Sequence, residues 1–425
     1  MKNRLLPHLL CLALATTAFA QTPRTLRVDY IRQGHAQHDT ILLQRFVAKH
    51  SPWAGNPRQP IDPIDNGVYC VVMADAATGH PLYSRHYNSL FEEYAATPEG
   101  KQGKEERFEE VALMPFPSSP VNILFQKRDG HQQMQTQASL YFDPSSTPVE
   151  HVSPTLAAPL LPLQSAGPIE RKMDVVIVPE GYGNADREKM MRDLLSFKQC
   201  LLGKEPFAAR DTDFNVWGVL AVGDTSGITD PAHNISVRSA VGSSYGTFGS
   251  DRYLMTQRLF QLHDLIDRVP YDHIIIMANS STYGGGAIYN FYAMSAVQQM
   301  SEWILPHELG HSIGGLADEY VEATADTSFD EMHPRNIEPM EPNITTLVDF
   351  GRKWETLLPS GTPIPTPPVE GLKKSECGPL GVYEGAGYVP KGVYRPVTSC
   401  MMRDYHPFCP VCTQRLNEVF DIYCK

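Results

Sequence analysis

The sequence predicts two folded parts: an all-β sandwich over residues 21–150 and an α/β domain with a mostly parallel, twisted sheet and flanking helices over residues 171–425. Three observations predict this architecture. A length of 425 residues exceeds one typical domain. The first part shows short apolar or alternating runs cut by turn residues, as in antiparallel sheets. The second part alternates continuous apolar runs with amphipathic stretches, as in parallel sheets.

The first twenty residues, MKNRLLPHLLCLALATTAFA, have the layout of a secretory signal peptide. Two basic residues precede an apolar run, and Ala18-Phe19-Ala20 supplies the small-x-small end. The run is too short to span a bilayer, and it continues past Cys11, which disfavours a lipoprotein cleavage box. We expect a mature chain beginning near Gln21, secreted or held in the periplasm or at the cell surface, with no transmembrane segment.

The N-terminal part contains four clear apolar or alternating runs, at residues 26–30, 68–73, 121–125 and 138–142. The last two flank Asp129-Gly130, which predicts a β-hairpin. Residues 143–170 then contain six prolines, each of which removes a backbone donor and restricts its predecessor. We therefore predict an interdomain linker at residues 151–170.

The α/β part is predicted from three apolar strands, at residues 174–178, 214–220 and 273–277. Amphipathic helices are expected at 184–202, capped by Asn184, and at 251–268. An edge strand is predicted at 287–293, after Gly284-Gly285-Gly286. Such a strand beside an active-site helix could receive an extended peptide, although the glycines fit a flexible loop equally well. Residues 323–397 are rich in Pro and Gly and predict loops.

The charge of the chain excludes some partners. The formal net charge is -12, and loss of Lys2 and Arg4 with the leader makes it about -14. An acidic surface repels phosphate backbones, so nucleic acid is not an expected partner. The glycine run at 284–286 also lacks the lysine and helix onset of a phosphate-binding loop.

Seven of the eight cysteines remain after the leader is removed, and five of them lie in the last fifty residues. In an exported protein such crowding predicts disulfides that cross-link a loop-rich end, with at least one free thiol. A structural zinc knot is the alternative, because Cys409-Pro-Val-Cys412 has ligand spacing. The irregular distances to Cys400 and Cys424 and the oxidising compartment favour disulfides.

The segment His307-Glu-Leu-Gly-His311 carries the clearest chemistry in the sequence. Histidines four residues apart lie on one face of a helix, close enough to share a Zn²⁺ ion. Glu308 lies beside that face, where it can take a proton from a zinc-activated water. Apolar neighbours bury the helix at least in part, and unpartnered buried histidines would be costly.

A catalytic zinc usually has three protein ligands. On a straight helix Asp318 would lie about 10 Å further along the axis than His311. Gly314-Gly315 allows the chain to leave the helix and fold back, so that a carboxylate reaches the metal. Asp318 is favoured over Glu319 as the third ligand. The other carboxylate, and Tyr320, are expected to orient a histidine.

Pro306 conflicts with an uninterrupted helix, because proline removes a helical hydrogen bond and clashes with the preceding turn. The helix is therefore expected to begin near Ile304 or to kink there.

Residues 307–320, HELGHSIGGLADEY, together with Ser399-Cys-Met-Met-Arg403, resemble the zinc metallopeptidases of the clostridial IgA-protease type, which are related to the metzincins. The resemblance implies a metzincin-like catalytic domain, with His307 and His311 as zinc ligands and Glu308 as general base. It implies a methionine turn at Met401-Met402, with Met402 beneath the metal, and Tyr405 as a candidate tyrosine near zinc. It also implies an exported protein with a β-rich N-terminal domain. The metzincin pattern places its third ligand at position 317, which is Ala here.

Three functions remain open from the sequence. The first is a secreted zinc endopeptidase that acts on protein or peptide substrates. The second is a non-catalytic surface binding protein with a vestigial zinc site, whose N-terminal domain attaches to a glycan or protein target. The third is a zinc amidase that trims cell-wall peptide. An intact Glu308 counts against the second.

Overall fold

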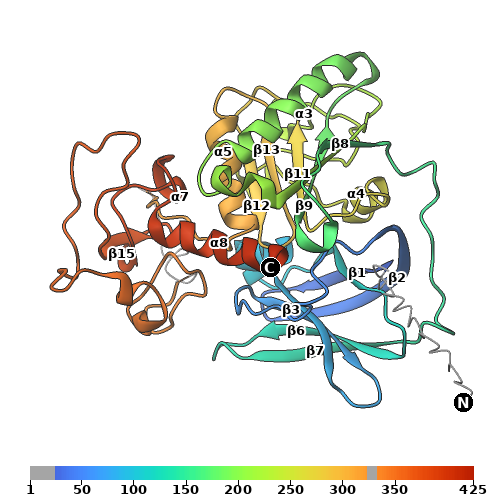
Figure 1. Cartoon of the computed structure of the whole chain (residues 1–425), viewed down its shortest axis with the longest axis horizontal. Coiled ribbons are helices and arrows are strands. Elements are labelled where there is room, and N and C mark those ends of the chain that lie inside the picture. The colour runs from blue at the N-terminus through green and yellow to red at the C-terminus, as the bar shows by residue number, and fades with distance from the viewer. Residues whose placement is uncertain (1–23, 323–332) are drawn as a thin grey trace, which may run out of the picture.

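The computed structural model describes residues 24–322 and 333–425. The expected signal peptide and residues 323–332 of the predicted loop region lie outside the described residues. Figure 1 shows the N-terminal strands, blue to teal, below an α/β part coloured green to orange, with the C-terminal loops to one side. None of the helices in the described ranges is both long and apolar enough to cross a membrane.

The N-terminal part consists of two antiparallel sheets, as predicted. The first has the order β2-β1-β5, and its strands are β1 (Arg24–His35), β2 (His38–Pro52) and β5 (Glu106–Pro115). The second has the order β4-β3-β6-β7, and its strands are β3 (Tyr69–Asp75), β4 (Pro81–Tyr87), β6 (Val121–Arg128) and β7 (Met134–Phe142). Strands β6 and β7 form the hairpin expected around Asp129-Gly130.

Aromatic side chains join the two N-terminal sheets. Tyr30 of β1 meets Phe125 of β6 with ring centroids 4.7 Å apart, and Phe46 meets Phe142 at 5.0 Å. Two short helices that the sequence pattern did not reveal, α1 (Leu90–Ala96) and α2 (Pro98–Lys101), follow β4. Each is too short to show a helical period, yet both are capped, α1 by Ser89 and α2 by Thr97.

The second part is built on a mixed, mostly parallel six-stranded sheet in the order β12-β13-β11-β9-β10-β8. Its strands are β8 (Leu160–Gln164), β9 (Met173–Glu180), β10 (Phe214–Val219), β11 (His273–Ala278), β12 (Gly285–Ile288) and β13 (Tyr292–Ala296). The four central strands are parallel, and the two edge strands run antiparallel to their neighbours. Its helices are α3 (Arg187–Leu202), α4 (Leu259–Leu265), α5 (Ser301–Ser312), α7 (Met401–Asp404) and α8 (Pro410–Cys424).

Short elements complete the chain. The hairpin of β14 (Tyr383–Ala386) and β15 (Val389–Arg395) lies in the region predicted as loops. The 3-10 helices are η1 (Ile169–Arg171), η2 (Asn184–Asp186), η3 (Ala208–Asp213), η4 (Pro231–His233), η5 (Thr247–Gly249), η6 (Phe350–Arg352) and η7 (Glu355–Leu357).

Side-chain alternation along β9 divides the interior into two clusters. Val175 and Ile177 pack with apolar residues of α3, α5 and α8. Val176 and Val178 point to the other face and join a cluster that includes α4 and the N-terminal sheets. The N-terminal sheets therefore share a hydrophobic core with the α/β part, and the two parts are not separate domains joined only by a flexible linker.

Three predicted boundaries are wrong. Residues 160–164, placed in the linker, form the edge strand β8, which tolerates proline because one side of an edge strand needs no ladder hydrogen bonds. The helix expected at 251–268 is helical only at α4, because Tyr253 and Met255 make β-bridges instead. Helix α3 begins at Arg187, and Asn184 opens a 3-10 turn before it.

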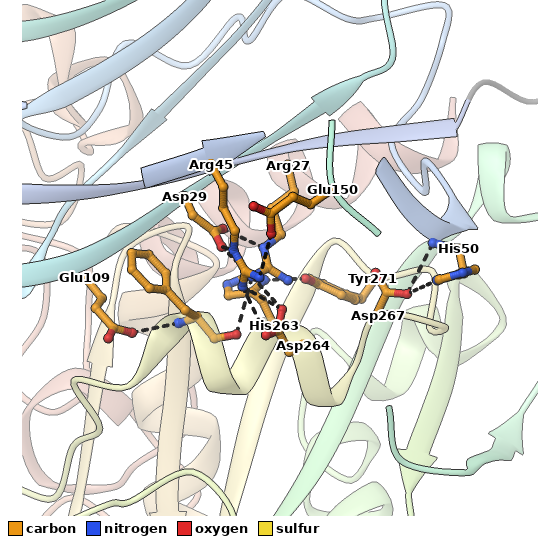
Figure 2. Close-up of polar contacts among 11 residues, drawn as sticks. Arg27, Asp29, Arg45, His50, Glu109, Glu150, His263, Asp264, Asp267 and Tyr271 are labelled. Carbon is orange, nitrogen blue, oxygen red and sulfur yellow. Dashed lines mark hydrogen bonds and ion pairs between the residues drawn. The ribbon is translucent and has the colours of Figure 1, made fainter. Parts of the chain in front are cut away.

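A buried ion-pair network fastens the first sheet to the region of α4 (Figure 2). Arg27, which is fully buried, binds Asp29 at 2.6 Å and Asp264 at 2.8 Å. Arg45 bridges the same two carboxylates, at 2.7 Å to Asp29 and 2.9 Å to Asp264. Further along, His50 contacts Asp267, whose backbone carbonyl accepts from Ser51 N–H at 3.2 Å. Because Arg27 and Arg45 each bind both carboxylates, truncating one arginine would leave Asp29 and Asp264 with a single cationic partner in this network.

Candidate metal centre

Helix α5 carries both histidines on one face. Their Nε2 atoms lie 3.2 Å apart and point toward a common point. His307 Nδ1 bonds to Met401 O at 2.9 Å, and His311 Nδ1 bonds to Leu316 O at 2.6 Å. Because each Nδ1 faces a carbonyl, it must carry the proton, and each Nε2 keeps its lone pair for a metal.

Pro306 lies inside α5, which begins at Ser301. The expected start near Ile304 is therefore wrong, and the alternative, a kink at that point, stays a prediction. The carbonyl that loses its helical donor belongs to Glu302, four residues earlier. Glu302 is exposed in the first turn of the helix, so water can satisfy its carbonyl.

The chain turns back after α5 at the predicted diglycine. Gly315 adopts a φ of +57°, and Leu316 N–H donates to Gly310 O at 3.1 Å. A Cβ on Gly315 would also lie 2.0 Å from Asn66 Nδ2 of the N-terminal part. The left-handed backbone and the lack of space both require glycine here.

This turn brings Asp318 to the histidines. Its Oδ1 lies 3.2 Å from His307 Nε2 and 3.4 Å from His311 Nε2. A tetrahedral ion with bonds of about 2.0 Å has ligand–ligand edges of about 3.3 Å, which matches all three sides of this triangle. Asp318 Oδ1 is buried and makes no hydrogen bond, although it lies close to both rings. Two imidazole nitrogens and this otherwise unsatisfied carboxylate oxygen fit Zn²⁺.

Asp318 is itself held by residues that the sequence did not single out. Tyr388, between β14 and β15, donates its hydroxyl to Asp318 Oδ2. Gly387 N–H donates to Asp318 O at 2.9 Å. Tyr320 packs edge-on against Tyr388, with ring centroids 5.1 Å apart, so its ring lies against the residue that holds Asp318. Tyr388 lies 70 residues from Asp318, and no local pattern connects the two.

Glu308 lies beside the triangle and against the edge strand β12. A Cβ on Gly285 would come within 2.8 Å of Glu308 Oε1, so the glycine makes room for this carboxylate. Burial raises the pKa of Glu308, while His307 and His311 oppose the rise. Glu93 of α1 is also within electrostatic reach, which brings the N-terminal part to the rim of the site.

Met402 and Tyr405, which the resemblance implies near the metal, both pack against α5. Met402 packs beneath α5, where a Cβ on Gly310 would come within 2.5 Å of its sulfur. Tyr405 lies edge-on to His307, with ring centroids 5.7 Å apart. Its hydroxyl bonds to that of Tyr283 at 2.6 Å.

The structure does not bring Glu319 to either histidine. Its Oε1 accepts from Asn343 Nδ2 at 2.9 Å and lies 3.5 Å from Cys412 Sγ. Asn343 also bonds to the backbone of Ala317 in both directions, at 2.8 and 2.9 Å. Asn343 therefore fastens the backbone on one side of Asp318 and the carboxylate on the other. The expectation that Glu319 orients a histidine finds no support in these contacts.

The edge strand predicted at 287–293 is wrong, because a turn at residues 289–291 divides that segment between the end of β12 and the start of β13. Asn290 in this turn has a φ of +55°. The edge of the sheet is formed by β12. Part of its outer edge is already used. Gly285 N–H donates to Arg252 O at 3.4 Å, and Gly285 O accepts from Leu254 N–H at 3.3 Å. An extended peptide could pair with β12 at Gly285 only after displacing residues 252–254.

Protonation competes with a metal at this site. Burial lowers the pKa of His311, but the charge and hydrogen bond of Asp318, together with the charge of Glu308 and the Leu316 carbonyl, raise that pKa to about 9. The same two histidines lower the pKa of Asp318 well below its usual range, although burial acts in the opposite direction. A metal must therefore displace protons from the imidazoles as it binds.

The family comparison agrees with this geometry. Residues 161–375 and 370–420 match the family model described as IgA Peptidase M64, and residues 18–139 match the model described as Peptidase M64 N-terminus. No curated protein matches the chain. The two family matches cover most of the sequence, and the chain belongs to the IgA peptidase M64 family. It is a zinc metallopeptidase, a hydrolase whose substrate is protein or peptide.

Proposed function

We propose that the chain is a secreted zinc endopeptidase whose metal is held by His307, His311 and Asp318 and whose general base is Glu308. The observation that carries the proposal is the triangle of two Nε2 atoms and Asp318 Oδ1, with edges of 3.2, 3.2 and 3.4 Å. Three protein ligands leave the fourth position of a tetrahedral zinc for water or substrate. The cluster thus has the donor set of a hydrolytic site.

When bound, zinc lowers the pKa of a coordinated water molecule and polarises the scissile carbonyl. Glu308 takes a proton from the attacking water and delivers it to the leaving amine. The raised pKa of Glu308 suits both proton transfers, because a carboxylate with a low pKa takes up a proton from water less readily. The imidazoles of His307 and His311 are oriented by the carbonyls of Met401 and Leu316. Met402 supports the helix from below.

Secretion is proposed from the signal peptide pattern of residues 1–20. We propose the N-terminal sheets as the part that attaches to a protein or glycan target, although their α1 also lies at the rim of the active site. The disulfides expected from the sequence are not confirmed, because every cysteine in the described ranges is a free thiol.

The test is a digest of a peptide library with both termini blocked, using the zinc-loaded mature chain. We expect cleavage by the wild type, and a loss of about 10²- to 10⁴-fold in kcat for Glu308→Gln with zinc content unchanged. Glu302→Gln is the matched control, because Glu302 is an exposed residue on the first turn of the same helix. Cleavage by Glu308→Gln at the wild-type rate would remove the assigned base.

Two further outcomes would select the other functions. A zinc-loaded wild type that cuts no library peptide but releases fragments from cell-wall peptide would indicate an amidase. A zinc-loaded chain that cuts neither would indicate a binding protein.

A further inference from the structure

A second group of metal-ligating side chains lies beside the first. Cys400 precedes α7, Cys409 caps the N-terminus of α8, and Cys412 lies in the first turn of that helix. Glu319 joins them from the segment after α5. All four side chains belong to residues with 0% exposure. One ligand atom from each lies within 4.8 Å of all the others.

The spacing of the sulfur atoms suits a metal. Cys400 Sγ and Cys412 Sγ are 3.8 Å apart. Zinc–thiolate bonds of about 2.3 Å in a tetrahedron place sulfur atoms about 3.8 Å from one another. The backbone agrees, because Cys409 N–H points to Cys400 Sγ at 3.4 Å and Cys412 N–H points to Cys409 Sγ at 3.5 Å. Such N–H donors stabilise negative charge on thiolates.

Glu319 provides an independent observation. Its Oε2 is buried and has no hydrogen-bond partner among the described residues, while its Oε1 is bonded to Asn343. Leaving a carboxylate oxygen buried and unsatisfied is costly. A cation among the three sulfur atoms would bind this carboxylate, whose Oε1 lies 3.5 Å from Cys412 Sγ, and would give each thiolate a partner.

A disulfide accounts for the group less well. It would use two of the three thiols and leave the third beside the unsatisfied carboxylate. One metal ion uses all four side chains at once. Sulfur donors in a tetrahedral arrangement select zinc over magnesium or calcium, which prefer oxygen.

We propose that Cys400, Cys409, Cys412 and Glu319 bind a second Zn²⁺ ion, which has a structural role and is separate from the catalytic one. Four protein ligands close the coordination shell, as in structural zinc sites. The ion would join α8 to the segment after α5 and to the methionine turn.

The position of the second ion would support the first. Glu319 follows Asp318 directly, and its N–H donates to Met402 O at 2.7 Å. Cys400 precedes Met401, whose carbonyl orients His307. The ion would therefore hold both segments that shape the catalytic triangle.

The test is metal analysis of the full mature chain, purified with zinc under reducing and under non-reducing conditions. We expect two zinc ions per chain and a sulfur shell at about 2.3 Å in zinc X-ray absorption. Cys409→Ser should retain one ion, and so should His311→Ala, but only the His311→Ala sample should keep the sulfur shell. Cys424→Ser, a half-buried cysteine outside the cluster, should keep both ions.

The measurement on the wild type stays decisive if a cysteine variant does not fold. One zinc per chain without a sulfur shell would overturn the proposal. So would a disulfide between any two of Cys400, Cys409 and Cys412, found by mass spectrometry of the non-reduced chain. Neither result depends on peptide cleavage, so failure of the proposed endopeptidase activity would be seen separately.

Discussion

The histidine–aspartate cluster and the cysteine–glutamate cluster meet at two consecutive residues, Asp318 and Glu319. Successive side chains of an extended segment point to opposite sides, so these two carboxylates serve different groups. The first cluster has three donors, of which His311 is partly open to solvent. Glu308, which lies beside the cluster, is also partly open. The second has four donors and no exposed member. Both clusters contain metal-binding residues, so the difference lies in access. A centre that is open to solvent suits catalysis, whereas a closed shell of four ligands suits a structural role.

The largest effect is expected from Asp318→Asn, which tests whether the two clusters bind metal independently. The amide keeps the shape of the side chain but loses the charge that binds the ion. We expect activity to fall by more than about a hundredfold, because even groups that only orient metal ligands contribute ten- to a hundredfold. Zinc content and peptide cleavage should be measured together. Retention of the cysteine-bound ion alone would support two independent centres. Loss of both ions would show that the second centre depends on the first.

Tyr388→Phe tests the hydrogen bond that holds Asp318 in place. The change removes the hydroxyl that donates to Asp318 Oδ2 while keeping the ring that packs on Tyr320. We expect zinc affinity at the catalytic centre to fall about ten- to a hundredfold, measured by competition with a chelator. Tyr394→Phe on β15 is the control, because its hydroxyl lies outside the site. Equal affinity in the two variants would mean that Tyr388 only packs.

Gly315→Ala tests the turn that separates the clusters. Alanine must adopt a φ of +57° and also displace Asn66, whose Nδ2 would lie 2.0 Å from the new Cβ. We expect the free energy of unfolding in urea to fall by about 1–3 kcal/mol, with a smaller loss of activity than for Asp318→Asn. Gly361→Ala, also at positive φ but with nothing within 4 Å, should show the backbone effect alone, about 1 kcal/mol. The same loss in both variants would contradict a role for the contact with Asn66.

Sequence reasoning went furthest where the signal was local. The hairpin of β6 and β7, the strands β9, β10 and β11, and helix α3 follow from runs of five to about twenty residues, interpreted by their period and turn type. It failed at 251–268, where an amphipathic pattern was overruled by β-bridges at Tyr253 and Met255. It also failed at β8, where proline hid an edge strand.

By itself, the sequence determined that His307 and His311 share a helix face, that Glu308 lies beside them, and that a diglycine turn follows. These are consequences of helical periodicity and of glycine's backbone freedom, which act over a few residues. Only the tertiary structure decided that Asp318 faces the histidines while Glu319 faces three cysteines, and that Tyr388 supports Asp318. Those choices depend on the packing of segments 70 to 93 residues apart, and no local pattern records which side of a segment a distant hairpin or helix will cover.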